Sequence, residues 1–197
     1  MNNFSLNTFL TSNLAIDESE LLSIRESCNV REYKKDAFLL RDNEHCQHTL
    51  FVEKGLLKQY ALDDKGKEHI LQFAPESWFV TDMESAYFNE PSRYFIQALE
   101  PTRIAFMDES FIKKLEQKSC KFRDFNNLLL YSQIRDLQRR VTMLMSNTAE
   151  ERYLQFIRTY PDILLRVPQT MVASYLGITP ESLSRVRKEL AHKNFKK

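Results

Sequence analysis

The chain of 197 residues contains little cysteine, little glycine and no long apolar run. The three cysteines, Cys28, Cys46 and Cys120, stand far apart, which excludes a disulfide framework and favours reduced thiols in a cytoplasm. They also lack the clustered spacing that an iron–sulfur centre requires. No apolar run approaches the ~18 residues of a membrane span, and the first residues do not form a secretory signal. We therefore expect a cytoplasmic protein that does not contact a membrane.

The net charge of +1 conceals an uneven distribution along the chain. Residues 1–117 carry 13 basic and 20 acidic side chains, a balance of −7, whereas segments 118–146 and 147–197 each carry a balance of +4. A chain that collects its basic charge at one end keeps that end available for a polyanion. Drift also produces biases of this size, so charge alone decides nothing.

The chain contains only three glycines, and two of them, Gly55 and Gly66, lie among short strand-like runs. These runs are 49–52, 57–62, 69–73, 78–80, 94–99 and 103–107. The two glycines predict hairpin turns at 53–55 and 63–67, and prolines separate the later runs. Short antiparallel strands at this spacing indicate a roll or barrel. Acidic residues at its start predict a helix at 17–25, before the strands.

Residues 102–160 contain neither proline nor glycine, and their apolar residues recur with helical spacing. Asp108 is expected to cap a short helix, and a long helix is expected over about 118–145. At ~1.5 Å per residue the long helix extends about 40 Å. Its apolar positions alternate by four and three residues, and they are Leu130, Ile134, Leu137, Val141 and Leu144. This heptad seam favours pairing with the same helix of a second copy, while packing on the helix's own domain is the alternative.

The most specific pattern lies in residues 168–192, which predict two helices joined by a short turn. Gly177 allows the positive φ of a tight turn, Thr179 is a suitable N-cap, and Pro180 fits the first position of the second helix. Apolar residues supply the contacts between the two helices, namely Val172, Leu176, Ile178, Leu183 and Val186. The pattern is that of a helix-turn-helix, whose second helix enters the major groove of duplex DNA.

The exposed face expected for the second helix carries the candidate DNA contacts. Arg185 can bind guanine O6 and N7 through two hydrogen bonds, and Glu181 can accept one from the amino group of cytosine. Four further side chains are placed to contact the DNA backbone, which positions the protein without reading sequence: Thr179, Ser182, Ser184 and Lys188. The competing interpretation of Arg185 and Glu181 is ordinary surface charge.

From about Phe38 to Asn194 the chain resembles the family of the cyclic-AMP receptor protein and the fumarate–nitrate regulator. The resemblance rests on the turn at 52–55, the hairpin at 64–68, the long helix and the segment 179–185. It implies an α+β fold with three parts: an N-terminal antiparallel β-roll of the cyclic-nucleotide-binding jelly-roll type over 1–117, a dimerisation helix over 118–146, and a C-terminal winged-helix-like helix-turn-helix over 147–197. The family's recognition helix typically reads Ser-Arg-Glu-Thr-hydrophobic-x-Arg, of which Glu181 and Arg185 match, whereas Pro180 replaces the first arginine. Only five residues follow His192, so the wing is expected to be short or absent.

The segment that corresponds to the family's cyclic-nucleotide cassette departs from it. That cassette resembles Gly-Glu-Leu-Gly, followed about ten residues later by an arginine that neutralises the cyclic phosphate. Here residues 81–84 read Thr-Asp-Met-Glu without either glycine, and the arginine is displaced by one position. Because nearby carboxylates also repel an anion, we expect no cyclic nucleotide and no other cofactor, and assign an unidentified signal to the roll. The candidate effector residues are Asp82, Met83, Arg93 and Tyr94.

These features predict a transcription regulator that binds a pseudopalindromic DNA site as a homodimer, with RNA polymerase as a further partner if it activates. No nucleophile–base–acid set and no phosphate-binding glycine loop is present in the sequence, so an enzyme is not expected. Two alternatives stay open. One is a ligand-binding or protein-interaction module that no longer reads DNA, and the other is a cupin-type metalloenzyme with His45, His48 and His69 as ligands. No metal is expected in the loop 44–48, because a structural zinc site generally needs four well-separated donors.

Overall fold

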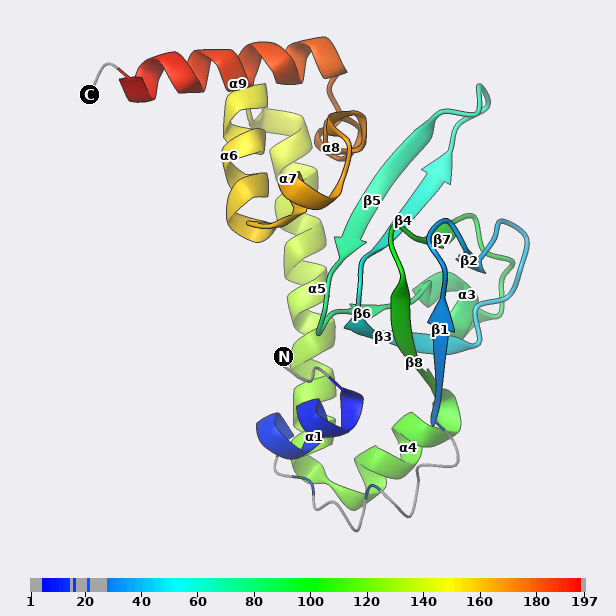
Figure 1. Cartoon of the computed structure of the whole chain (residues 1–197). Helices are drawn as coiled ribbons and strands as arrows, with labels where there is room; N and C mark the ends of the chain where they lie inside the picture. The colour runs from blue at the N-terminus through cyan, green and yellow to red at the C-terminus, as the bar shows by residue number, and fades with distance from the viewer. Residues whose placement is uncertain (1–4, 15, 17–20, 22–27, 196–197) are drawn as a thin grey trace. The chain divides into compact units, whose positions relative to one another are not determined.

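The computed structural model describes residues 5–14, 16, 21 and 28–195, which fold into two compact units (Figure 1). The first, here called the roll unit, comprises Met1–Ala61 and Leu71–Tyr131. The second, the helical unit, comprises Leu62–Ile70 and Ser132–Lys197. The helix expected at 17–25 lies outside the described residues apart from Leu21. The three-part division expected from the sequence is a division by function and stays a prediction.

Two four-stranded sheets form the roll, and the strand pairs are antiparallel. The first sheet has the order β1 (Cys28–Tyr33), β8 (Thr102–Asp108), β3 (His48–Lys54) and β6 (Phe79–Val80). The second has the order β2 (Phe38–Leu40), β7 (Phe95–Ala98), β4 (Leu57–Leu62) and β5 (Glu68–Ala74). The expected antiparallel β-roll is therefore confirmed, with β1 and β2 as additions that the sequence pattern did not indicate.

The hairpin predicted at 53–55 is wrong. Strand β3 pairs with β8 and β6, whereas β4 lies in the other sheet and pairs with β7, so the turn carries the chain from one sheet to the other. Gly55 permits this crossing because its φ is +93°, and a Cβ there would lie 2.8 Å from the carbonyl oxygen of Pro101. The hairpin predicted at 63–67 is confirmed, and the N–H of Gly66 donates to the carbonyl of Asp63 over 2.9 Å.

Alternate residues of β3 and β8 serve two different cores, as the period of two in a strand requires. Leu50, Val52, Ile104 and Phe106 lie in the core between the two sheets. Phe51, Ala105 and Met107 face the other side of the first sheet, where they pack with α1 (Leu6–Leu14), α4 (Glu109–Lys118) and the start of α5 (Cys120–Ser146). Figure 1 shows α4 following directly from the end of β8.

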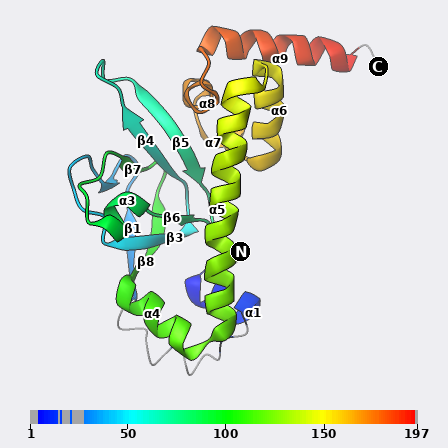
Figure 2. The same cartoon turned by 180° about the vertical axis from the view of Figure 1, so that it is seen from behind.

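Side-chain caps begin two of the helices of the roll unit, α3 and α4. Asp82 accepts hydrogen bonds from the N–H groups of Glu84 and Ser85 at the start of α3 (Met83–Phe88). Asp108 accepts from the N–H of Phe111 over 2.6 Å at the start of α4, which confirms the expected cap. The long helix is confirmed as α5, an unbroken helix of 27 residues (Figure 2).

Four helices complete the helical unit: α6 (Ala149–Thr159), α7 (Ile163–Arg166), α8 (Gln169–Leu176) and α9 (Pro180–Phe195). Thr148 and Glu151 form a reciprocal capping box at the start of α6. In Figures 1 and 2, α9 crosses the N-terminal end of α6, where Lys193 pairs with Glu150 at 2.8 Å. The expected pair of helices around Gly177 is confirmed as α8 and α9.

Candidate nucleic-acid interface

At the turn between α8 and α9, Gly177, Thr179 and Pro180 have the roles that the sequence predicted. Gly177 ends α8 with a φ of +66°, where any Cβ would be strained and would lie 3.2 Å from the side chain of Leu144. The hydroxyl of Thr179 accepts a hydrogen bond from the N–H of Ser182 over 3.2 Å, so it caps α9. Pro180 is the first residue of α9, where its missing N–H costs nothing. The direction of α9 is therefore set by local chemistry at both sides of the turn.

Apolar contacts hold α9 against the rest of the helical unit. Buried side chains at this contact, each less than a tenth exposed, are Val172, Ala173, Leu176, Leu183 and Val186. Two aromatic rings also pack against α8. The ring centres of Phe156, in α6, and Tyr160, at its C-terminal end, lie 5.2 and 5.6 Å from the ring centre of Tyr175. The inner face of α9 is thus occupied, and its outer face is left for solvent or a partner.

The predicted DNA contacts lie on that outer face or at its start. Glu181 and Arg185, the two predicted base-reading residues, are both exposed in the first half of α9. Of the predicted backbone contacts, Thr179, Ser184 and Lys188 are exposed and Ser182 is partly buried beside the cap. The fold therefore brings all six side chains to one surface segment, residues 179–188, here called the recognition surface.

The carboxylate of Glu181 stays ionised at neutral pH. Its pKa is lowered by a hydrogen bond from its own backbone N–H and by another from the hydroxyl of Thr179. An ionised carboxylate only accepts hydrogen bonds, which suits the amino group of cytosine and opposes phosphate. Within the recognition surface, Glu181 is therefore suited to base edges, Arg185 to bases or phosphates, and Lys188 to phosphates.

The heptad seam of α5 is exposed over most of its length. Ile134, Leu137 and Val141 are 54%, 63% and 55% exposed, Leu144 is 39% exposed, and Leu130 is partly buried. Soluble proteins rarely leave a contiguous apolar stripe open unless something else covers it. Within the described part of the chain, nothing therefore supplies the cover that the single-domain alternative requires for these side chains.

Three side chains that the sequence did not single out as contacts hold the helical unit together. Arg140 of α5 donates from Nη2 to the carbonyls of Ile70 and Tyr175 over 3.0 and 2.9 Å. The hydroxyl of Ser174 accepts from the N–H of Ile70 and donates to the carbonyl of Glu68. These bonds join the first residues of β5 to α8, the first helix of the helix-turn-helix.

Arg152 of α6 is the third of these side chains. It donates to three backbone carbonyls, those of Leu144, Asn147 and Leu176, over 2.9 to 3.1 Å. It therefore ties the end of α5 to the end of α8. No sequence pattern indicates such bonds, because every residue type supplies the same carbonyl acceptor.

The four candidate effector residues lie in different surroundings. Asp82 is buried at the start of α3 with Oδ1 used as the cap, and its Oδ2 has no hydrogen-bond partner within the described part of the chain. Met83 lines a cavity on the helix side of the first sheet. Arg93 is exposed, and Tyr94 is partly buried next to Ser92, whose hydroxyl accepts its N–H. Their common role in effector binding stays a prediction.

The cupin-type alternative gains no support from the described residues, which contain no group of three or more His, Cys, Asp or Glu side chains able to hold a metal ion. Instead, Nε2 of His69 lies 2.9 Å from Oδ2 of Asp63 on the β4–β5 hairpin. Within the same described ranges, no helix is long and apolar enough to cross a membrane.

Comparison with known proteins covers both units. Residues 30–119 match the family model of the cyclic nucleotide-binding domain. The transcriptional activator protein Anr of Pseudomonas aeruginosa is 27% identical over 167 residues, which cover 79% of this chain and 68% of that protein. The fumarate and nitrate reduction regulatory protein of Vibrio cholerae is 24% identical over 183 residues, 87% of this chain and 72% of that protein.

Solved structures agree on the fold. FixK2 of Bradyrhizobium japonicum superposes with a TM-score of 0.72 at 19% identity, covering 85% of this chain and 86% of that one. A CooA mutant of Carboxydothermus hydrogenoformans also reaches 0.72 at 21% identity, covering 93% and 84%. Residues 30–119 therefore belong to the cyclic nucleotide-binding domain family, and the curated relatives that the chain resembles over most of its length are transcription regulators of the Crp/Fnr type.

Members of the Crp/Fnr family bind DNA and act as dimers, which agrees with the recognition surface and the seam described above. The alternative of a module that does not read DNA gains no support from these relatives, which are regulators of transcription. The match to the cyclic nucleotide-binding domain describes the roll and not its ligand. Segment 81–84 still lacks both cassette glycines and begins a helix capped by a buried carboxylate.

Proposed function

We propose that this Crp/Fnr regulator works as a homodimer whose two α9 helices read successive major grooves of a pseudopalindromic DNA site. The observation that carries the proposal is the recognition surface, where Glu181 and Arg185 stand exposed in the first half of a helix whose inner face is buried. A helix docked in the major groove presents its N-terminal residues to base edges. Arg185 suits guanine and Glu181 suits cytosine, while Thr179, Ser182, Ser184 and Lys188 suit the DNA backbone.

Pairing of two copies through the heptad seam supports this arrangement. The seam repeats at four and three residues, and four of its five side chains are at least 39% exposed in the single chain. Two such helices bury these side chains against each other by knobs-into-holes packing. A dimer of this kind presents two recognition helices about 34 Å apart, one turn of the DNA duplex.

A signal received in the roll can reach α8 through the β4–β5 hairpin. Strand β4 begins and strand β5 ends in the roll unit, while Glu68 and Ile70 of β5 bond to Ser174 and Arg140 in the helical unit. We assign the effector to segment 81–94 of the roll, with Asp82, Met83, Arg93 and Tyr94 as candidate contacts. RNA polymerase is the further partner if the protein activates transcription. The protein acts in the cytoplasm, where the DNA is. The proposal includes no enzymatic step.

Selection of binding sites from a pool of random duplexes tests the proposal. The full chain is expected to enrich an inverted repeat with half-site centres about 10 to 10.5 base pairs apart. The Arg185→Ala variant is expected to lose the preference at one base pair in each half-site and to keep the spacing. Recovery of unenriched DNA with the folded chain at moderate salt would rule out sequence reading by α9.

A further inference from the structure

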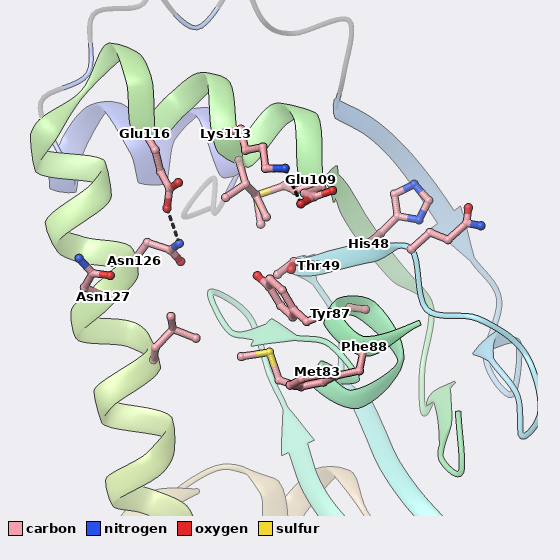
Figure 3. A pocket seen from close by; sticks show the side chains of 15 residues that line it. His48, Thr49, Met83, Tyr87, Phe88, Glu109, Lys113, Glu116, Asn126 and Asn127 are labelled. Atoms are coloured by element: carbon pink, nitrogen blue, oxygen red, sulfur yellow. Dashed lines mark hydrogen bonds and ion pairs between the residues drawn. The ribbon is translucent and has the colours of Figure 1, made fainter. Parts of the chain in front are cut away.

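The roll unit contains a cavity of about 510 Å³ outside the core between its two sheets (Figure 3). Thr49 of β3 and Met107 of β8 are register partners on its floor, and Met107 belongs to the core on the helix side of the first sheet. Helices α3 and α4 and the first part of α5 form its walls. Cavities that bind small molecules span roughly 300–1,000 Å³, so the size suits an organic ligand.

One face of α4 and one face of α3 point into the cavity. Residues 109, 112, 113 and 116 of α4 follow the spacing of a single helix face, and they place two carboxylates and one ammonium in the wall. Helix α3 adds Met83, Tyr87 and Phe88, and both aromatic side chains are more than half exposed. Figure 3 shows Tyr87 and Met83 turned toward the space below Glu116. The cavity therefore combines aromatic and thioether surfaces with charge on one wall.

The charge of this wall is unbalanced. Lys113 Nζ lies 2.6 Å from Glu109 Oε1, so these two charges compensate each other. Glu116 accepts a hydrogen bond from the amide of Asn126 over 2.8 Å, which satisfies one oxygen and leaves the negative charge. Burial lowers the pKa of His48, so this ring is neutral at pH 7 and adds no positive charge. The lining therefore carries a net charge of minus one.

We propose that this cavity binds a small organic cation, an ammonium group carried on an apolar body. The carboxylate of Glu116 and the faces of Tyr87 and Phe88 attract the cation, because an aromatic ring presents negative potential above its plane. Met83, Met107 and Leu130 supply apolar surface for the body of the ligand. The same wall repels anions, including the phosphate of a cyclic nucleotide.

Binding at this cavity contacts α3, the helix that replaces the family's nucleotide cassette. A ligand here therefore meets the segment that we assign to the signal, and this effector role rests on the proposed function. Occupancy itself does not depend on DNA, so it is measured on the full chain without DNA.

Methyl resonances of the methionines report occupancy at known places. The chain has six methionines, of which Met83 and Met107 line the cavity, whereas Met143, Met145 and Met171 lie in the helical unit. Titration with 2-phenylethylammonium is expected to give saturable shifts at Met83 and Met107 only. The neutral analogue 2-phenylethanol is expected to bind more weakly, and phenylacetate is expected not to bind.

The Glu116→Gln variant isolates the charge, because it keeps the shape of the side chain. It is expected to bind 2-phenylethylammonium about fivefold more weakly, the value of one partly exposed ion pair, with no change for 2-phenylethanol. Glu32→Gln, at an exposed position of β1, is the matched control and is expected to leave both affinities unchanged. Equal affinity for all three probes, absence of shifts at Met83 and Met107, or an unaffected Glu116→Gln variant each overturns the proposal. Failure to select DNA sites, with these shifts intact, instead contradicts only the regulatory function.

Discussion

The guanidinium of Arg140 lies over the ring of Tyr175, with its central carbon 3.9 Å from the ring centre, and it also donates to the backbone carbonyl of that residue over 2.9 Å. The same nitrogen donates to the carbonyl of Ile70 in β5 over 3.0 Å. Nη1 of Arg140 is buried without a hydrogen-bond partner among the described residues. One arginine of the long helix therefore holds both β5 and the helix-turn-helix.

Replacement of Arg140 by alanine is expected to destabilise the protein by about 2–3 kcal/mol, because two carbonyls lose a charged donor and the ring loses its cation. Arg140→Lys is expected to recover only part of this, since an ammonium cannot lie flat on the ring. Urea unfolding of the full chain measures both. Arg139→Ala, whose side chain is 63% exposed, is the control and is expected to stay within about 0.5 kcal/mol of the parent. A loss in Arg139→Ala equal to that in Arg140→Ala would contradict the assigned contacts.

Replacement of Ser174 by alanine removes one hydroxyl that serves two backbone groups of β5. The hydroxyl oxygen accepts a hydrogen bond from the N–H of Ile70 over 3.1 Å, and the O–H group donates one to the carbonyl of Glu68 over 2.6 Å. The expected cost is about 1–2 kcal/mol, with faster hydrogen exchange at the amide of Ile70. Ser184→Ala, at an exposed position of α9, is expected to change neither quantity. An unchanged rate of hydrogen exchange at the Ile70 amide in Ser174→Ala would exclude the hydrogen bond from this amide to Ser174.

The Arg185→Ala and Lys188→Ala variants are expected to weaken DNA binding in different ways. Arg185→Ala should cost about 1–3 kcal/mol on the selected site and relax the preference at one base pair. Lys188→Ala should weaken binding to all duplexes alike and reduce the slope of log K against log salt by about one. Competition binding at several salt concentrations separates the two. Uniform loss in Arg185→Ala would reassign that residue to the phosphates.

A glutamate in the heptad seam is expected to break the dimer. Leu137→Glu places a carboxylate opposite its own copy in the seam, and burial of an unpaired charge costs several kcal/mol. The dissociation constant of the dimer, measured by analytical ultracentrifugation, should rise at least tenfold, about 1.4 kcal/mol. Leu165→Glu is the control, because Leu165 is 89% exposed on α7 and lies outside the seam. An unchanged dissociation constant in both variants would contradict dimerisation through the seam.

The carboxyl of Asp63 is expected to titrate well below its ordinary range. A hydrogen bond with His69, followed by those from the N–H groups of Lys67 and Lys65, lowers its pKa from 3.8 to about 2. Since the folded pKa is the lower one, the ionised group stabilises the hairpin above pH 4, and this contribution is lost as the pH falls toward 2. In His69→Gln the pKa measured by carbon NMR should rise, while His192→Gln should leave it unchanged. A value near 3.8 in the parent contradicts the hydrogen-bond network.

The helix-turn-helix could be predicted because its determinants are local. Gly177, Thr179 and Pro180 each act within a few residues of their own position, so the sequence displays the turn directly. The same holds for Asp108 at the start of α4. The recognition surface follows from helix spacing once these boundaries are known.

The error at 53–55 and the omissions arise from long-range contacts. Gly55 and the apolar residues around it look the same in a hairpin as in a crossing between sheets, and only the pairing of β3 with β8 decides between them. Strand β1 is mostly exposed, so it lacks the alternating pattern that marks a half-buried strand. The contacts of Arg140 could not be predicted from the sequence, because its partners are carbonyls 35 and 70 residues away.

A dimer that holds two recognition helices at a fixed separation tolerates only certain spacings between its two half-sites. The affinity of the full chain is measured for duplexes in which two, five or ten base pairs are inserted at the centre of the selected site. Five inserted base pairs turn one half-site about half a turn around the duplex, so binding is expected to fall to that of a single half-site. Equal affinity for all these duplexes would contradict a rigidly paired dimer on two successive grooves.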